Sequence, residues 1–349
     1  MTACYTRYLM EFNRPGGTSR GVLTTKETFF LKLTSPTGWG VGECAVFRGL
    51  SRDDRPDYEE KIRWACEHID LGPEILKSRL ADWPSLVFGL EQAFRSLASA
   101  DPFLLFDGPF TSGEPIPING LIWMGSPQYM EEQVAEKLEA GYRCLKFKIG
   151  ALDFETEWRV LHRLRQRYPA DRLEIRVDAN GAFTPEEAPL KLDRLAELEV
   201  HSIEQPIRAG QWRAMETLCR DSPVPVALDE ELIPLETRAQ KLEVLDTVKP
   251  DYLILKPSLL GGYAACEDWI GWARDRGIGW WVTSALESNI GLNAIAQWTA
   301  GLPTELPQGL GTGSLFSNNF SAPLETGPGI LRYRPEVGWD RDKIKRLCT

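Results

Sequence analysis

The chain has 349 residues, of which 43% are hydrophobic and 26% are charged, and its formal net charge is −10. This composition is normal for a soluble globular protein, and the acidic balance argues against general binding to nucleic acid or anionic membranes, because no basic excess is present to neutralise phosphates. The first residues lack the apolar core of a signal peptide, and no apolar run approaches the ~20 residues that a membrane span requires.

Cysteine and histidine usage argues against a disulfide framework and against a zinc site. The seven cysteines lie far apart without a CxxC pair, and the three histidines are scattered along the chain. We therefore expect reduced cysteines, structural histidines and a cytoplasmic location.

Residues 1–115 are expected to form a separate α+β unit. Residues 25–35 alternate between polar and apolar, and residues 40–44 return after a turn, which predicts a hairpin. Apolar residues at helical spacing then predict three helices, over 57–69, 73–80 and 84–99. The segment 13–21 carries glycines, a proline and two arginines, and it is expected to be a mobile loop.

Residues 116–316 alternate short apolar runs with amphipathic helices, which predicts βα units around a parallel sheet. The candidate strands are 116–123, 144–149, 174–179, 202–206, 225–230, 252–257, 279–284 and a weaker eighth at 306–311. The helices that fit between them are 127–140, 153–168, 185–198, 211–220, 235–244, 263–276 and 290–300. Eight such units predict an α/β fold with a (β/α)8-type barrel, a modified TIM barrel, which the first unit would cap.

The alternative architecture is a doubly wound open sheet, but no GxGxxG follows the first strand of the barrel region. Residues 317–349 are rich in proline and glycine. They are expected to pack back onto the 1–115 capping unit.

Charged side chains recur at the ends of successive strand candidates, about one βα unit apart. They are Lys146, Lys148, Asp178, Glu204, Asp229 and Lys256. Because the carboxyl ends of parallel barrel strands meet at one mouth, where such enzymes carry out catalysis, these groups should converge there.

Carboxylates beside lysines in one place indicate a divalent cation between them. Oxygen ligands suit a hard ion, so Mg²⁺ is favoured over Zn²⁺, with Mn²⁺ as a substitute. Burial and a neighbouring ammonium group also lower the pKa of a lysine, which would make one amine of the Lys146–Lys148 pair available as a base.

The strand-end motifs resemble the enolase superfamily, and within it the muconate-lactonising-enzyme subgroup. The matching strings are KFK at 146–148, VDAN at 177–180, IEQP at 203–206, LDE at 228–230 and LKP at 255–257. The resemblance implies Mg²⁺ held by Asp178, Glu204 and Asp229, with Lys148 and Lys256 on opposite faces of a small carboxylate substrate. Subgroups that use a late histidine are disfavoured, because none follows His201.

Two further stretches are similar to the o-succinylbenzoate synthase family, residues 284–297 and the Gly-rich segment 308–320. This similarity implies a lyase of menaquinone biosynthesis, which dehydrates 2-succinyl-6-hydroxy-2,4-cyclohexadiene-1-carboxylate to 2-succinylbenzoate. Ser284, Glu287 and Gly311 are then candidate substrate contacts.

Other candidate residues flank the metal ligands or lie in the expected loop. Asn180 and Glu230 adjoin two of the predicted ligands and are expected to orient ligands or lysines. Arg14 and Arg20 are candidates to meet the succinyl carboxylate of the substrate.

Two other functions stay open. One is racemisation of an N-acylamino acid on the same two lysines, and the other is a barrel that binds its ligand without turnover. Dipeptide epimerases are disfavoured, because residues 306–313 offer no acid for an ammonium group. The oligomeric state is not determined by the sequence.

Overall fold

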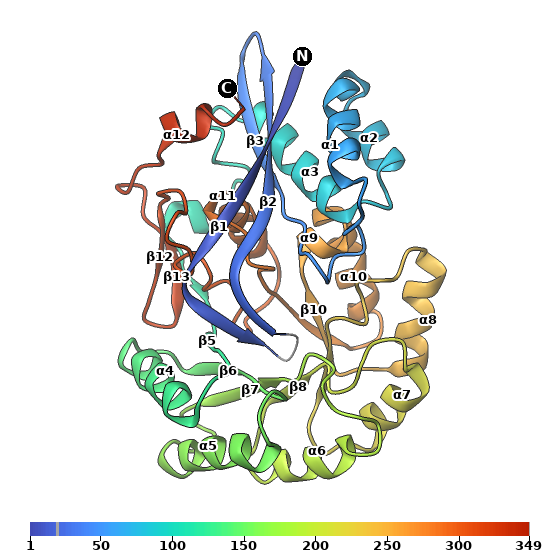
Figure 1. Cartoon of the computed structure of the whole chain (residues 1–349), viewed down its shortest axis with the longest axis vertical. Helices are drawn as coiled ribbons and strands as arrows, with labels where there is room; N and C mark the ends of the chain where they lie inside the picture. The colour runs from blue at the N-terminus through green and yellow to red at the C-terminus, as the bar shows by residue number, and fades with distance from the viewer. Residues whose placement is uncertain (19–20, 349) are drawn as a thin grey trace.

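The computed structural model describes residues 1–18 and 21–348, and Figure 1 shows an N-terminal unit standing above a ring of strands and helices. The N-terminal unit has an antiparallel sheet in the order β1-β2-β3. Its elements are β1 (Thr2–Thr18), β2 (Gly21–Ser35), β3 (Gly38–Cys44), α1 (Tyr58–Glu67), η1 (Ile69–Leu71), α2 (Pro73–Arg79) and α3 (Pro84–Ala98). The predicted hairpin and the three helices are therefore confirmed.

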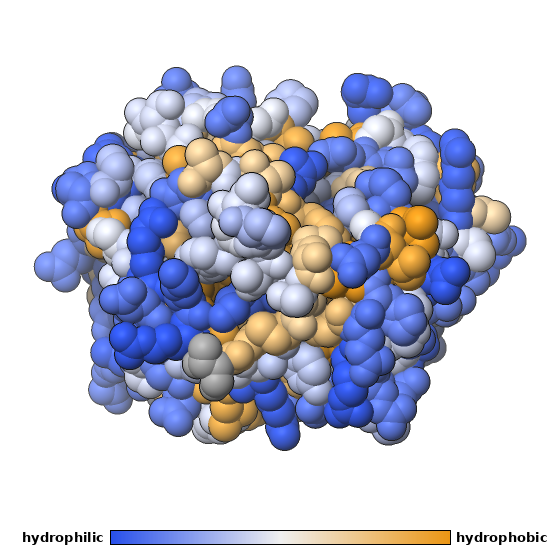
Figure 2. Space-filling model, turned by 90° about the horizontal axis from the view of Figure 1, so that it is seen from above, coloured by the Kyte–Doolittle hydropathy of each residue, from blue (hydrophilic) through white to orange (hydrophobic). Residues whose placement is uncertain are grey.

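Side chains of this sheet alternate between two faces. Phe29, Leu31 and Leu33 of β2 are buried against α1 and α3 in one apolar cluster. Both faces of β2 are covered, because Phe30 on the opposite face lies in a second apolar cluster. Seen from above, the surface of this part is mostly hydrophilic, with hydrophobic residues showing between the polar ones (Figure 2).

The central sheet of the described chain has seven parallel strands in the order β11-β10-β9-β8-β7-β6-β5. Their bounds are β5 (Gly120–Ile122), β6 (Cys144–Lys148), β7 (Glu174–Asp178), β8 (Ser202–Glu204), β9 (Val226–Leu228), β10 (Tyr252–Leu255) and β11 (Gly279–Val282). The helices around it are α4 (Pro127–Glu139), α5 (Phe154–Arg167), α6 (Ala188–Ala196), α7 (Trp212–Asp221), α8 (Arg238–Val248), α9 (Pro257–Leu260), α10 (Gly262–Arg274) and α11 (Asn289–Ala300). The prediction of a modified TIM barrel with a capping unit is confirmed, although α9 was not foreseen.

The weak eighth strand is reduced to two isolated parallel bridges. Gln308 pairs with Ile118, and Gly309 pairs with Thr283, so this segment joins the two edges of the sheet. A side chain at position 309 would place its Cβ 1.7 Å from the Thr283 hydroxyl oxygen. The close approach that completes the ring therefore requires glycine at this position.

The prediction of a mobile loop over residues 13–21 is wrong for its described part. Strand β1 continues to Thr18 and pairs with β2 beyond a register shift that follows Glu11. Its end also bridges to the barrel, because Gly17 pairs with Met124, and a Cβ on Gly17 would lie 2.4 Å from the Met124 carbonyl oxygen. Arg20 lies outside the described residues.

The C-terminal segment lies against both the barrel and the N-terminal sheet. Strand β13 (Ile330–Tyr333) pairs with β12 (Leu324–Thr326) and with β4 (Ile116–Pro117), which leads into the barrel. The short helix η2 (Phe110–Ser112) lies just before β4, and α12 (Arg341–Lys345) is the last helix of the described chain. Trp339 stacks on Phe103 with ring centroids 4.2 Å apart. The division of the chain into domains at residue 115 stays a prediction.

Within the described ranges, no helix has the length and apolar character that a membrane crossing requires.

Candidate active site

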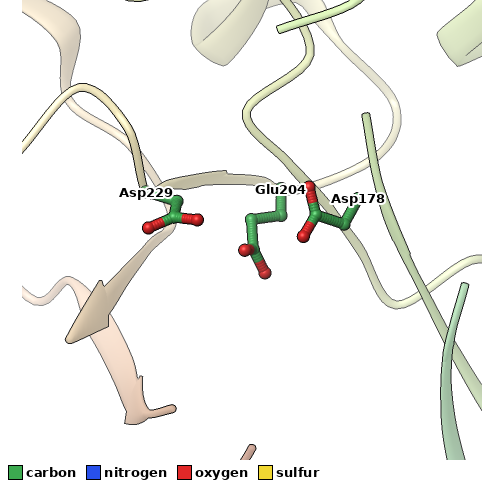
Figure 3. Close-up of side chains that lie close together, drawn as sticks. All are labelled: Asp178, Glu204 and Asp229. Atoms are coloured by element: carbon green, nitrogen blue, oxygen red, sulfur yellow. The ribbon is translucent and has the colours of Figure 1, made fainter. Parts of the chain in front are cut away.

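Three carboxylates converge at the carboxyl ends of neighbouring strands. Asp178 and Glu204 are the last residues of β7 and β8, and Asp229 directly follows β9. Their ligand oxygens all lie within 4.8 Å of one another, and the three side chains point toward a shared space (Figure 3). All three residues are buried, so their charges must be compensated locally.

The three predicted lysines supply that compensation. Lys146 Nζ donates to Glu204 Oε2 at 2.5 Å and lies 2.8 Å from Asp178 Oδ2. Lys148 Nζ donates to Asp178 Oδ2 at 2.5 Å, and Lys256 Nζ donates to Asp229 Oδ2. The structure therefore brings together all six residues that the strand-end pattern identified.

The two lysines of β6 differ in their electrostatics. Burial opposes the charge of Lys146, but the carboxylates of Asp178 and Glu204 outweigh it and raise the pKa of this ammonium. Burial lowers the pKa of Lys148, and although Asp178 opposes this shift, the like charge of Lys146 adds to it. Lys148 is thus the better base of the pair.

The pKa values of Asp178 and Glu204 shift in opposite directions. Burial opposes ionisation of Asp178, yet Lys146 and Lys148 hold its pKa well below the ordinary value. Burial and the nearby charge of Asp178 together raise the pKa of Glu204 well above its ordinary value. Like charges at this distance destabilise each other unless a cation joins them.

The donor set fits a divalent cation. Glu204 Oε1 is buried and has no hydrogen-bond partner among the described residues, so one ligand oxygen lacks a protein donor. An all-oxygen set of carboxylates suits a hard ion such as Mg²⁺ or Mn²⁺.

Asn180 and Glu230 lie where they can orient Lys148. The Asn180 side chain accepts a hydrogen bond from Lys148 Nζ at 3.0 Å and donates one to Glu230 Oε1 at 2.8 Å. The backbone of Asn180 has φ of 45°, a left-handed conformation that asparagine tolerates better than most residues.

Sequence reasoning missed a second supporting pair, Gln205 and Glu231. The Gln205 side-chain oxygen accepts hydrogen bonds from the backbone N–H groups of Asp229 and Glu231, and so fixes the turn that carries Asp229, a candidate metal ligand. Glu231 accepts from Gly210 N and Trp212 Nε1 at 2.7 Å each. The glutamine of the IEQP string was the available signal.

A cavity of about 720 Å³, including its mouth, is lined by Lys146, Lys148 and Lys256. It lies between the barrel and the N-terminal unit, because Thr18, Leu23 and Phe47 of the cap complete its wall. The barrel contributes Asn119, Leu121, Trp123, Leu259, Thr283, Ser284, Ala285, Leu286, Gly309, Gly311 and Thr312 beside the lysines.

The predicted substrate contacts occupy different positions. Ser284 and Gly311 line the cavity, whereas Glu287 is fully buried behind its wall. Glu287 accepts hydrogen bonds from Ser284 Oγ at 2.6 Å and from Ser258 Oγ at 2.5 Å, and so links the ends of two strands. Arg14 is exposed and pairs with Glu136 on α4.

Comparisons with known proteins agree with this geometry. Residues 129–337 match the family described as enolase C-terminal domain-like. The o-succinylbenzoate synthase of Desulfotalea psychrophila is 46% identical over 95% of this chain and 98% of its own length. The crystal structure of MenC from the same organism superposes with a TM-score of 0.85 at 41% identity, covering 95% of this chain and 99% of MenC.

A more distant solved structure shares the fold. The L-Ala-D/L-Glu epimerase of Bacillus subtilis has a TM-score of 0.82 at 20% identity, over 97% of this chain and 99% of that one. Fold, site geometry and full-length similarity lead to one conclusion: this chain belongs to the enolase superfamily and, within it, to the o-succinylbenzoate synthase family.

Proposed function

We propose that this protein is a metal-dependent o-succinylbenzoate synthase, which dehydrates 2-succinyl-6-hydroxy-2,4-cyclohexadiene-1-carboxylate to 2-succinylbenzoate. The observation that carries the proposal is the placement of Lys148 and Lys256 in the wall of one cavity, on either side of the acid triad. The molecule that this protein binds and converts is therefore a small carboxylate. The 46% identity to a synthase over nearly the whole chain supports the same substrate.

The reaction requires removal of the proton at C1 and loss of the hydroxyl group at C6. Lys148, whose pKa is lowered by burial, takes the C1 proton as a neutral amine. The resulting ammonium returns that proton to the departing hydroxyl on the same face, so water leaves and the ring becomes aromatic. Asn180 holds the Lys148 nitrogen through its hydrogen bond.

Charge develops on the substrate carboxylate as the proton leaves. Asp178, Glu204 and Asp229 would hold a divalent cation, for which we propose Mg²⁺ with Mn²⁺ as a substitute, and when bound it supplies positive charge beside that carboxylate. Lys256 keeps its charge, because Asp229 outweighs the effect of burial and raises the pKa of this ammonium. It therefore stabilises the enediolate from the other face.

An assay on the purified protein tests the function directly. With Mg²⁺ present, the cyclohexadiene acid should be converted to 2-succinylbenzoate, followed by the new aromatic proton signals in NMR. Absence of turnover by folded, metal-loaded protein would contradict the proposal.

Racemisation of an N-acylamino acid is the second candidate. It is favoured by the same two lysines, because racemisation requires one proton-exchanging group on each face of the substrate. Exchange of the α-proton of N-succinylamino acids for deuterium in D₂O measures it.

A further inference from the structure

Asn119 lies in the cavity wall but has no role in the chemistry above. It is 5% exposed, and its side-chain oxygen is buried without a hydrogen-bond partner among the described residues. Its backbone N–H donates to the Gln308 carbonyl, at the seam between the first strand and the eighth-strand segment. The amide nitrogen Nδ2, which is the donor of this side chain, also has no hydrogen-bond partner among the described residues, so it is available to a molecule in the cavity.

The position of Asn119 is deep in the barrel. Leu121 pairs with Lys146, and Asn119 precedes Leu121 by two residues, so both side chains face the cavity with Asn119 ~7 Å nearer its floor. Gly309 and Gly311 flank it without side chains, and a Cβ on Gly311 would lie 3.3 Å from Ile118 Cδ1. A side chain at either glycine position would therefore crowd this part of the wall.

Three hydroxyl groups of this wall already have protein partners. Thr312 Oγ1 donates to Ser284 Oγ at 2.8 Å, and Ser284 in turn donates to Glu287. Thr283 Oγ1 donates to the Gly309 carbonyl at 3.1 Å. The nearby Leu121 and Leu286 are apolar and offer no hydrogen bond.

We infer that the Asn119 amide donates a hydrogen bond to the ketone oxygen of the succinyl arm and so determines specificity for an acyl side chain. The inference rests on the proposed function. With the ring carboxylate at the acid triad on β7 to β9, the adjacent arm reaches the wall formed by β11, residues 308–311 and Asn119. The ketone oxygen is a neutral acceptor and matches the neutral Asn119 donor at the buried floor of the cavity. The carboxylate of the succinyl arm would lack a counter-charge there, and burying it would cost free energy.

The test compares two ligands that differ only at the ketone. One is 2-succinylbenzoate, and the other is 4-(2-carboxyphenyl)butanoate, in which CH₂ replaces the carbonyl. Calorimetric titration of the Mg²⁺-loaded wild type should show the ketone ligand binding between about threefold and tenfold more tightly. In Asn119→Leu, which keeps the side-chain volume, the two ligands should bind alike.

Kinetics and stability give independent readouts of the same variant. The ketone stays neutral throughout the reaction, so its hydrogen bond should be equally strong in the substrate complex and in the transition state. In Asn119→Leu, KM should therefore rise by a similar factor while kcat changes little. The melting temperature should not fall, because leucine removes a buried amide that lacks a partner. Asn293→Leu is the matched control: this asparagine is buried, donates to the Phe103 carbonyl and accepts from Gln297, so its loss should lower the melting temperature and leave the ligand preference intact.

The outcomes separate the two proposals. Suppose that the wild type dehydrates its substrate, but that either Asn119→Leu keeps the full preference for the ketone ligand or the wild type shows no such preference. Asn119 then does not bind the ketone, and the proposed function stands. If the wild type neither turns over the substrate nor binds 2-succinylbenzoate, while Mn²⁺ binding is normal, both proposals fail.

Discussion

Lys146 and Lys148 lie two residues apart on one strand, yet they have opposite electrostatics. Lys146 contacts two carboxylates and its pKa is raised, whereas Lys148 contacts Asp178 alone among the acids and its pKa is lowered by burial. In the proposed mechanism, Lys146 is therefore the fixed charge that balances the acids, and Lys148 is the proton carrier.

Replacing Lys148 by alanine should lower the dehydration rate by ~10²–10⁴-fold, the usual contribution of a positioned acid–base group. Mn²⁺ affinity and the circular dichroism spectrum should stay close to those of the wild type. A variant that retained more than about a hundredth of the rate would place the base elsewhere.

The variant Lys256→Arg separates the two candidate chemistries. Syn dehydration uses Lys256 only as a cation, and arginine stays charged but cannot act as a base, so measurable dehydration should persist while racemisation falls to background. The measurement is the ratio of the two activities, with Lys256→Ala as the control that removes the charge. Equal losses in folded, metal-loaded protein would mean that Lys256 transfers protons in both reactions.

At the scale of elements, a carboxylate of the cap binds the start of a barrel helix. Glu43 on β3 is fully buried and accepts hydrogen bonds from Ser288 N at 3.0 Å, Ser288 Oγ at 2.6 Å and Gly291 N at 3.1 Å, at the N-terminus of α11. The charge of the carboxylate also matches the positive end of the helix dipole. Lys26 is buried nearby, where burial lowers the pKa of its ammonium group and the attraction of Glu43 opposes that shift.

Glu43→Gln should therefore lower the free energy of unfolding by about 1–3 kcal/mol, because the amide group cannot accept all of these hydrogen bonds and Lys26 loses a counter-charge. Denaturant titration measures the loss. In the double variant with Lys26→Met, the loss should be smaller than the sum of the two single losses, since the buried charges are removed together. Additive losses would show that the two residues are not coupled.

At the scale of the whole molecule, a cation held by three strands would couple metal binding to folding. The three proposed ligands come from β7, β8 and the residue after β9, which are separated in sequence and are brought together by the closed sheet. Unfolding would disperse them, so metal should bind the folded state selectively.

Exhaustive chelation should remove activity, and Mg²⁺ or Mn²⁺ should restore it. At a metal concentration 100 times Kd, the folded state should gain about 2.7 kcal/mol, seen as a higher melting temperature in calorimetry. Glu204→Gln is the control, since it should lose this metal dependence. Full activity after complete chelation would contradict the metal assignment.

The sequence by itself determined the fold class and the chemistry at the strand ends. Alternation and apolar runs are local properties, and they predicted three helices of the N-terminal unit, seven helices and seven strands of the barrel, and the order of Asp178, Glu204 and Asp229 along the chain. Because a βα unit has a nearly constant length, residues one unit apart fall at the same height of a barrel. The strand-end motifs could therefore be read together without any coordinates.

Tertiary structure decided which groups meet. Four features depend on segments that lie far apart in sequence. They are the pairing of β1 through Thr18, the closure of the ring at Gly309, the support of Asp229 by Gln205 and the unpartnered side-chain oxygen of Asn119. The different pKa shifts of Lys146 and Lys148 likewise follow from burial and from the carboxylates that each contacts. Local sequence patterns do not predict these contacts, because the contacts form only when the ring of strands closes and the N-terminal unit packs onto it.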